Sequence, residues 1–125
     1  MTTELTITND LIIVEPLPLD QQLAAVYIAG LAKGSQRTMQ AALDKIAYLL
    51  IGVPDSLQVQ WRRLRFQHTA AIRSKLAESY SAATANKMLS TLRGVLKSAW
   101  RLGQMSRDDY QRAVDIDRIF GRFLT

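Results

Sequence analysis

The sequence predicts an all-α protein, a compact bundle of four to five helices that follows an extended N-terminal arm. Apolar residues recur at spacings of three and four in segments separated by Gly or Pro, as in amphipathic helices. No window of alternating apolar and polar residues is long enough for a sheet. A chain of 125 residues with 48% hydrophobic content suffices for one core. We therefore expect an arm over residues 1–19, a helical domain over 20–118 and the start of a linker over 119–125.

The N-terminal arm is expected to be extended because the two prolines of Pro16-Leu17-Pro18 exclude a helix there. The apolar run Leu11–Val14 would lie as a short strand against the domain or a neighbouring molecule, which would cover an edge prone to association. A first helix is then expected to begin after Asp20, a suitable N-cap, and to end at the break formed by Lys33 and Gly34.

A second helix is expected to begin at the N-cap Ser35 and to end at Gly52 and Pro54. Its first turn, residues 35–38, presents hydroxyls, an amide and a guanidinium beside unpaired backbone N–H groups. Such a helix start is a natural seat for a phosphate group.

Trp61 and Leu64 are predicted to anchor the core, and a third helix is expected from about Thr69 to Glu78. His68 is interpreted as a surface residue or a satisfied polar residue, because the chain has no second histidine with which it could bind a metal.

The longest predicted helix begins at the N-cap Ser81 and ends at Gly103, which tolerates a positive φ. One side of it carries a broad apolar stripe that requires a core. The residues of this stripe are Met88, Leu89, Leu92, Val95, Leu96, Ala99 and Trp100.

The opposite side of the same helix is cationic and carries no carboxylate. Its basic residues, among small side chains, are Lys87, Arg93, Lys97 and Arg101. Because a solvated helix usually alternates the sign of its charges, this face suggests contact with a polyanion. A capping box over 106–109 then predicts a short fifth helix.

The net charge of +5 is concentrated in the middle of the chain. Residues 1–32 contain four acidic residues and no basic one, residues 33–103 contain twelve Lys or Arg against three Asp or Glu, and residues 104–125 contain four of each. This basic excess suits the phosphate backbone of a nucleic acid, although it could equally keep a small domain in solution.

The sequence predicts no catalytic residue, metal site or cofactor in this chain. It lacks Gly-rich phosphate loops, the HExxH motif and cysteine, and its adjacent acids Asp108 and Asp109 are interpreted as partners of a helix dipole. We also expect a soluble, cytoplasmic protein, because there is no run of 18 apolar residues and no signal peptide.

Two segments together resemble the N-terminal core-binding domain of tyrosine recombinases, the phage-integrase type. They are residues 34–38 with the helix after them, and residues 81–105 with their cap, amphipathic register and terminal Gly. The resemblance covers roughly residues 21–120. It implies a SAM-like bundle that clamps one face of duplex core-site DNA during integration or recombination. A separate catalytic domain, beyond residue 125, would cleave the strands from the other face.

The resemblance also implies the DNA contacts and partners. The chain itself would not be an enzyme, whereas the parent protein would be a nucleoid-associated tyrosine recombinase of a bacterium or phage. Its partners would be double-stranded DNA and other protomers in a synaptic complex, with no membrane. The implied contacts are Ser35, Arg37, Thr38 and Gln40 from one helix, and Ala83, Thr84, Asn86 and Lys87 from the other.

The helical wheel adds Arg93, Lys97 and Arg101 to these contacts. Most contacts are expected to reach phosphates, and Arg37, Asn86 and Lys87 are the candidates for base edges. Two other interpretations stay open at this point. One is a stand-alone helix-turn-helix regulator, and the other is a helical protein-protein adaptor that uses the apolar edges 11–14 and 120–124.

Overall fold

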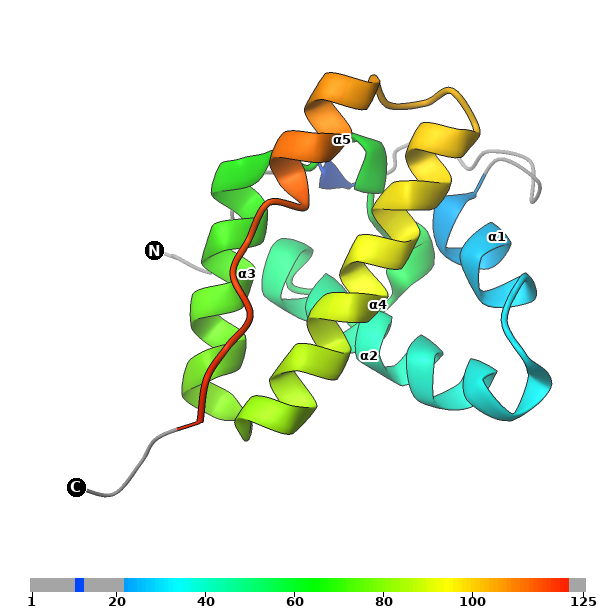
Figure 1. Cartoon of the computed structure of the whole chain (residues 1–125). Coiled ribbons are helices and arrows are strands. Elements are labelled where there is room, and N and C mark those ends of the chain that lie inside the picture. The colour runs from blue at the N-terminus through cyan, green and yellow to red at the C-terminus, as the bar shows by residue number, and fades with distance from the viewer. Residues whose placement is uncertain (1–10, 13–21, 122–125) are drawn as a thin grey trace.

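The all-α prediction is confirmed by the computed structural model, which describes residues 11–12 and 22–121 (Figure 1). Within these residues there is no strand, and two short 3-10 turns, Ser56–Gln58 and Trp61–Arg63, join α2 to α3. The helices are α1 (Leu23–Ala29), α2 (Lys33–Ile51), α3 (Phe66–Ser79), α4 (Ala82–Arg101) and α5 (Arg107–Ala113).

Helix α4 lies in the middle of the bundle and packs against α1, α2, α3 and α5 (Figure 1). Its predicted apolar stripe is buried over most of its length, together with Ala85 and Thr91. Trp100 is the exception, because its indole is only half buried and stacks on Tyr110 of α5, with ring centroids 5.3 Å apart. The residue that fills the core is Trp61, which is 1% exposed.

The predicted starts of α4 and α5 and the predicted end of α4 are confirmed. The Ser81 hydroxyl accepts a hydrogen bond from the Thr84 N–H at 3.2 Å, and the Ser106 hydroxyl accepts one from the Asp109 N–H at 3.0 Å. Gly103, just beyond α4, has a φ of 75°, which an L residue with a side chain rarely adopts.

The starts of α2 and α3 differ from the prediction. Helix α2 begins at Lys33, so that Ser35 lies inside its first turn, and the break that was expected at Lys33 and Gly34 lies between α1 and α2, at residues 30–32. The amide of Gln36 donates to the Leu31 carbonyl at 3.1 Å and stabilises this earlier start. Helix α3 begins at Phe66, before the predicted Thr69.

His68 explains the early start of α3. Its Nδ1 accepts a hydrogen bond from the Arg65 N–H at 2.9 Å, which satisfies a backbone donor that the helix itself leaves unpaired. The imidazole is buried, so that the expectation of a satisfied polar residue is confirmed. Burial, and then the positive charge of Arg65, lower the pKa of His68 below its ordinary value.

Acidification is expected to destabilise the fold through His68. Because the pKa of His68 is lower in the folded chain, the unfolded chain binds the proton more tightly, and stability is lost as the pH falls below about 6.5. The melting temperature of the wild type should therefore fall between about pH 7.5 and about pH 5.5, where His68 is the only histidine that titrates. His68→Gln should lose this pH dependence, and equal profiles for the two proteins would contradict the assignment.

The described part of the N-terminal arm lies against the domain, as one of the two options for residues 11–14 predicted. The Leu11 side chain is 1% exposed, and Ile12 forms an isolated antiparallel bridge with Val59. The Gln60 N–H donates to the Leu11 carbonyl, at 2.6 Å. The remaining predictions for residues 1–19, including Ile13 and Val14, and the expected cap Asp20 lie outside the described residues.

After α5 the chain runs between α3 and α4 as an irregular segment, residues 114–121, which we call the strap (Figure 1). Ile116 and Ile119 of the strap are buried, whereas Phe120 is 75% exposed. Ile119, the first residue of the predicted linker, is therefore packed into the body, whereas Phe120 and Gly121 are exposed and residues 122–125 lie outside the described part of the chain.

Candidate nucleic-acid interface

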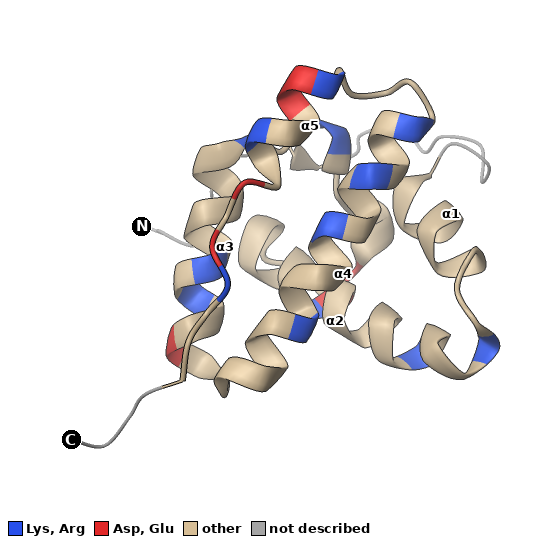
Figure 2. Ribbon diagram, in the orientation of Figure 1, with Lys and Arg blue, Asp and Glu red and all other residues tan. Residues whose placement is uncertain are grey.

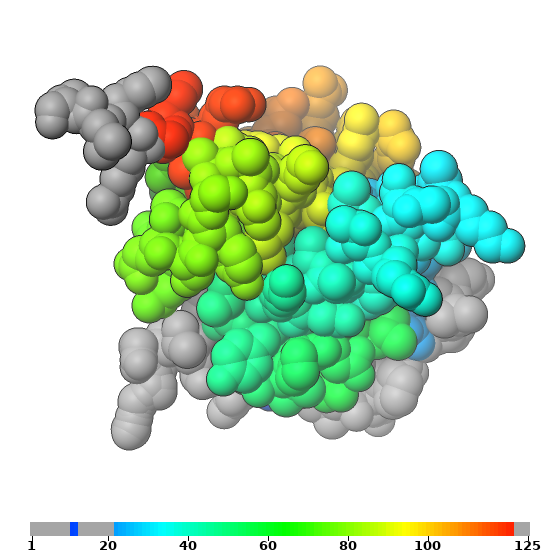
Figure 3. Space-filling view, turned by 90° about the horizontal axis from the view of Figure 1, so that it is seen from below, coloured from blue at the N-terminus to red at the C-terminus, as the bar shows by residue number. Residues whose placement is uncertain are grey.

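Four of the predicted DNA contacts line one cavity of about 360 Å³ between the N-terminal halves of α2 and α4, which we call the α2–α4 hollow. Figure 3 looks at this side, with the start of α2 in cyan beside the first turns of α4 in yellow-green. The four are Arg37, Thr38, Thr84 and Lys87. The other lining residues are Met39, Ala41, Ala42, Lys45, Met88 and Thr91.

The lining follows from the helical period of the two helices. Thr38, Ala41 and Lys45 recur at spacings of three and four along α2, and Thr84, Lys87 and Thr91 do so along α4. Each set therefore forms one edge of its helix, next to the buried stripe. Small alanines between the helices leave space that larger side chains would fill.

The floor of the hollow is apolar and its rim is basic. Met39 and Met88 contribute thioether side chains, and the Thr91 hydroxyl donates a hydrogen bond to Met39 Sδ at 2.9 Å. Arg37, Lys45 and Lys87 supply positive charge, and all three are exposed. Among the described residues, none of them has a carboxylate oxygen within 4.0 Å of its charged nitrogen.

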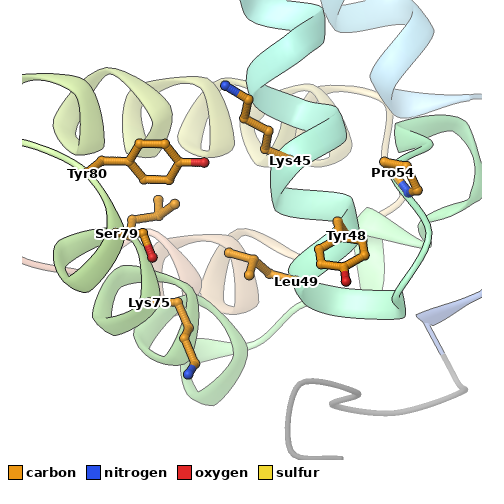
Figure 4. Close-up of a pocket in the computed structure, with 8 residues that line it drawn as sticks. Lys45, Tyr48, Leu49, Pro54, Lys75, Ser79 and Tyr80 are labelled. Atoms are coloured by element: carbon orange, nitrogen blue, oxygen red, sulfur yellow. The ribbon is translucent and has the colours of Figure 1, made fainter.

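Lys45 is a functional candidate that the sequence analysis missed. The signal was present, because Lys45 follows Thr38 by seven residues and so shares its side of α2. Lys45 also lines a second cavity, of about 230 Å³, between α2 and α3 (Figure 4). There its ammonium lies 5.7 Å from the ring centroid of Tyr80, within the range of a cation–π interaction.

Gln40 does not line the hollow. Its Nε2 donates to Asp44 Oδ1 at 3.0 Å and to the Ser56 hydroxyl at 2.7 Å, and Asp44 Oδ1 also accepts from the Ser56 N–H. This network ties α2 to the turn that follows it. The side chain that the resemblance placed at DNA is therefore used inside the protein.

Asn86 and Arg93 hold the strap. The Asn86 amide donates to the Ile119 carbonyl at 2.7 Å and its Oδ1 accepts from the Ile119 N–H at 2.8 Å. The Arg93 guanidinium donates to the carbonyls of Val114 and Ile116, at 3.4 and 2.6 Å. Both side chains leave α4 toward the strap and away from the hollow's lining.

Lys97 lies farther along α4, where it lines a separate cavity against α1 with Arg101. In this cavity α1 and α4 approach closely at Gly94. A Cβ at this position would lie only 2.3 Å from Cε1 of Tyr27. The basic residues of α4 are therefore not all directed at the hollow. Figure 2 shows Lys and Arg positions spread along α4 and at the start of α2.

Ser35 and Ala83 are the two remaining predicted contacts. Ser35 is half buried in the first turn of α2, and Ala83 is exposed in the first turn of α4. Neither lines the hollow, although each belongs to the same helix start as residues that do.

The described part of the chain contains no group of three His, Asp or Glu side chains that could hold a metal ion. None of its helices has both the length and the apolar content needed to cross a membrane. Comparisons of the chain with protein-family models, with curated proteins and with solved structures found no match.

Proposed function

We propose that this chain is a DNA-binding domain, specifically the core-binding domain of a tyrosine recombinase of the phage-integrase type. In this role it clamps one face of duplex core-site DNA during integration or recombination. Strand cleavage belongs to a separate domain of the parent enzyme, and other protomers are partners in the synaptic complex. The proposal rests on the sequence resemblance and on the α2–α4 hollow.

The observation that carries the proposal is the convergence of Arg37 and Lys87 on one hollow. They come from helices far apart in the sequence, and Lys45 adds a third cation to the same rim. Duplex DNA presents a dense row of phosphates, and each cation that neutralises one releases condensed counterions. A rim of three cations without nearby carboxylates among the described residues therefore suits this ligand better than it suits a neutral protein surface.

The helix starts strengthen this interpretation. Arg37 and Thr38 lie near the start of α2, and Thr84 and Lys87 lie near the start of α4. Unpaired backbone N–H groups and the helix dipole make such starts attractive to anions. The proposed contact set is Ser35, Arg37, Thr38, Lys45, Ala83, Thr84 and Lys87, without the internally bonded Gln40, Asn86 and Arg93.

The proposal is tested by the salt dependence of duplex binding. Arg37→Gln combined with Lys87→Gln should weaken binding and lower the slope of log K against log salt by about two, because two phosphate contacts are lost. The measurement is fluorescence anisotropy of a labelled duplex across a series of salt concentrations.

The matched control is Arg62→Gln combined with Arg63→Gln, which removes the same charge from exposed positions of the turn before α3. This control should keep the wild-type slope. Equal slopes in the wild type and the hollow variant would contradict the proposed contacts. A protein that binds no duplex at low salt would instead favour the protein-protein adaptor.

A further inference from the structure

We propose that the α2–α4 hollow recognises the C5-methyl groups of thymine in the major groove, and does not read adenine through a side-chain amide. This inference rests on the proposed function and adds the kind of base that the domain prefers. It follows from which polar side chains near the hollow are already bonded inside the protein, and from what the remaining lining offers to a base pair.

The amides that could read adenine are occupied. A bidentate contact with adenine needs both the NH₂ group and the oxygen of an Asn or Gln. Asn86 uses its nitrogen and its oxygen on Ile119, at 2.7 and 2.8 Å. Both hydrogens of the Gln40 amide are directed at Asp44 and Ser56. The Gln36 amide uses one of its hydrogens on the Leu31 carbonyl, and Gln36 does not line the hollow.

What remains in the hollow is mainly apolar surface and positive charge. The rim cations can contact phosphates or the acceptors of guanine. The neutral lining consists of methyl, methylene and thioether groups with a few hydroxyls, contributed by Thr38, Met39, Ala41, Ala42, Thr84, Met88 and Thr91. In the major groove the only apolar group on a base edge is the thymine methyl, and Ala and Thr methyl groups are its usual partners.

The size of the hollow is compatible with this ligand. Its volume of about 360 Å³ is larger than one methyl group requires, and its exposed lining residues Thr38, Ala41 and Thr84 present methyl groups at the surface. Each methyl group that leaves water for an apolar contact is expected to improve the affinity by about fourfold. The methyl groups of thymine should therefore decide a measurable part of the affinity, in addition to the salt-dependent phosphate term.

The experiment compares duplexes that differ only in base methyl groups. Affinity for the wild-type domain is measured on an A·T-rich duplex and on the same duplex with deoxyuridine in place of thymidine. A second pair consists of a G·C-rich duplex with cytosine and its counterpart with 5-methylcytosine. The domain should bind the thymidine duplex about fourfold or more tighter than the deoxyuridine duplex, and the 5-methylcytosine duplex tighter than the unmethylated one.

A variant links the effect to the hollow. Thr38→Ser combined with Thr84→Ser removes two methyl groups and keeps both hydroxyls, including the one that lies beside Ser81 Oγ. Both positions are exposed, so that the fold should tolerate the change. The ratio of thymidine to deoxyuridine affinity should fall toward one in this variant. The matched control is Thr2→Ser combined with Thr3→Ser, in the arm, which should keep the wild-type ratio.

The outcomes separate the two proposals. Salt-dependent binding with equal affinity for the methylated and unmethylated member of both pairs would overturn methyl recognition and leave DNA binding intact. A difference between thymidine and deoxyuridine that persists unchanged in the Thr38→Ser, Thr84→Ser variant would also overturn it, because DNA shape would then be the cause. Lack of binding to every duplex would overturn DNA binding itself.

Discussion

Trp61→Ala is expected to lower the free energy of unfolding by about 3–5 kcal/mol, the loss that a buried aromatic residue typically gives through transfer and cavity terms. The Trp61 side chain is 1% exposed, and its turn packs against α1 and α4. Its Nε1 donates to the Ser56 carbonyl at 2.9 Å, so that the variant also leaves a buried acceptor without this partner. Urea denaturation followed by circular dichroism measures the change.

Trp100→Ala is the matched comparison for Trp61→Ala. The sequence pattern places Trp100 in the apolar stripe of α4 and therefore predicts a loss of similar size. The indole is only half buried and stacks on the ring of Tyr110. Its truncation should cost clearly less than that of Trp61. Equal losses for the two variants would contradict the assignment of Trp61 as the main aromatic anchor of the core.

Asn86→Ala is expected to release the strap. The variant removes both hydrogen bonds to the Ile119 backbone, and the loss of stability should be about 1–3 kcal/mol because partly buried backbone groups lose their partners. Amide hydrogen exchange should accelerate over residues 116–121. The salt slope of DNA binding should stay that of the wild type, since the structure uses Asn86 internally.

Ser90→Ala is the control for Asn86→Ala, because Ser90 is exposed on the same helix. It should change neither stability nor exchange in the strap. If Asn86→Ala instead left hydrogen exchange unchanged and lowered the salt slope, Asn86 would be a DNA contact, as the sequence resemblance predicted. The two readouts together therefore distinguish a positioning role from a binding role.

Much of the fold could be predicted because it depends on local rules. The apolar period of α4 and the caps Ser81 and Ser106 act within one or two helical turns, and a short window of sequence contains all the information needed. The predicted starts of α2 and α3 were wrong because local rules do not describe them. Arg65 and Ala32 are not usual capping residues, and the His68 ring that completes the start of α3 is not part of the common pattern.

The candidate site could be predicted only in part. The resemblance implied Arg37, Thr38, Thr84 and Lys87 as contacts, and the structure brings these four residues together in the lining of one hollow. A helical wheel gives the cationic side of α4, but it does not show which other segment of the chain packs against that side. The strap meets Asn86 and Arg93 from positions 21 or more residues away along the chain, and no local pattern of α4 contains that contact.

The hydrogen bonds that fix the strap limit which substitutions it tolerates. Arg73, Asn86 and Arg93 bind it through peptide groups, which every residue type shares. Substitutions at Asp117 and Phe120 should therefore leave its course unchanged, whereas proline at position 119 would remove the N–H that Asn86 accepts. Outside the buried Ile116 and Ile119, residue types in the strap can therefore change while its path is preserved.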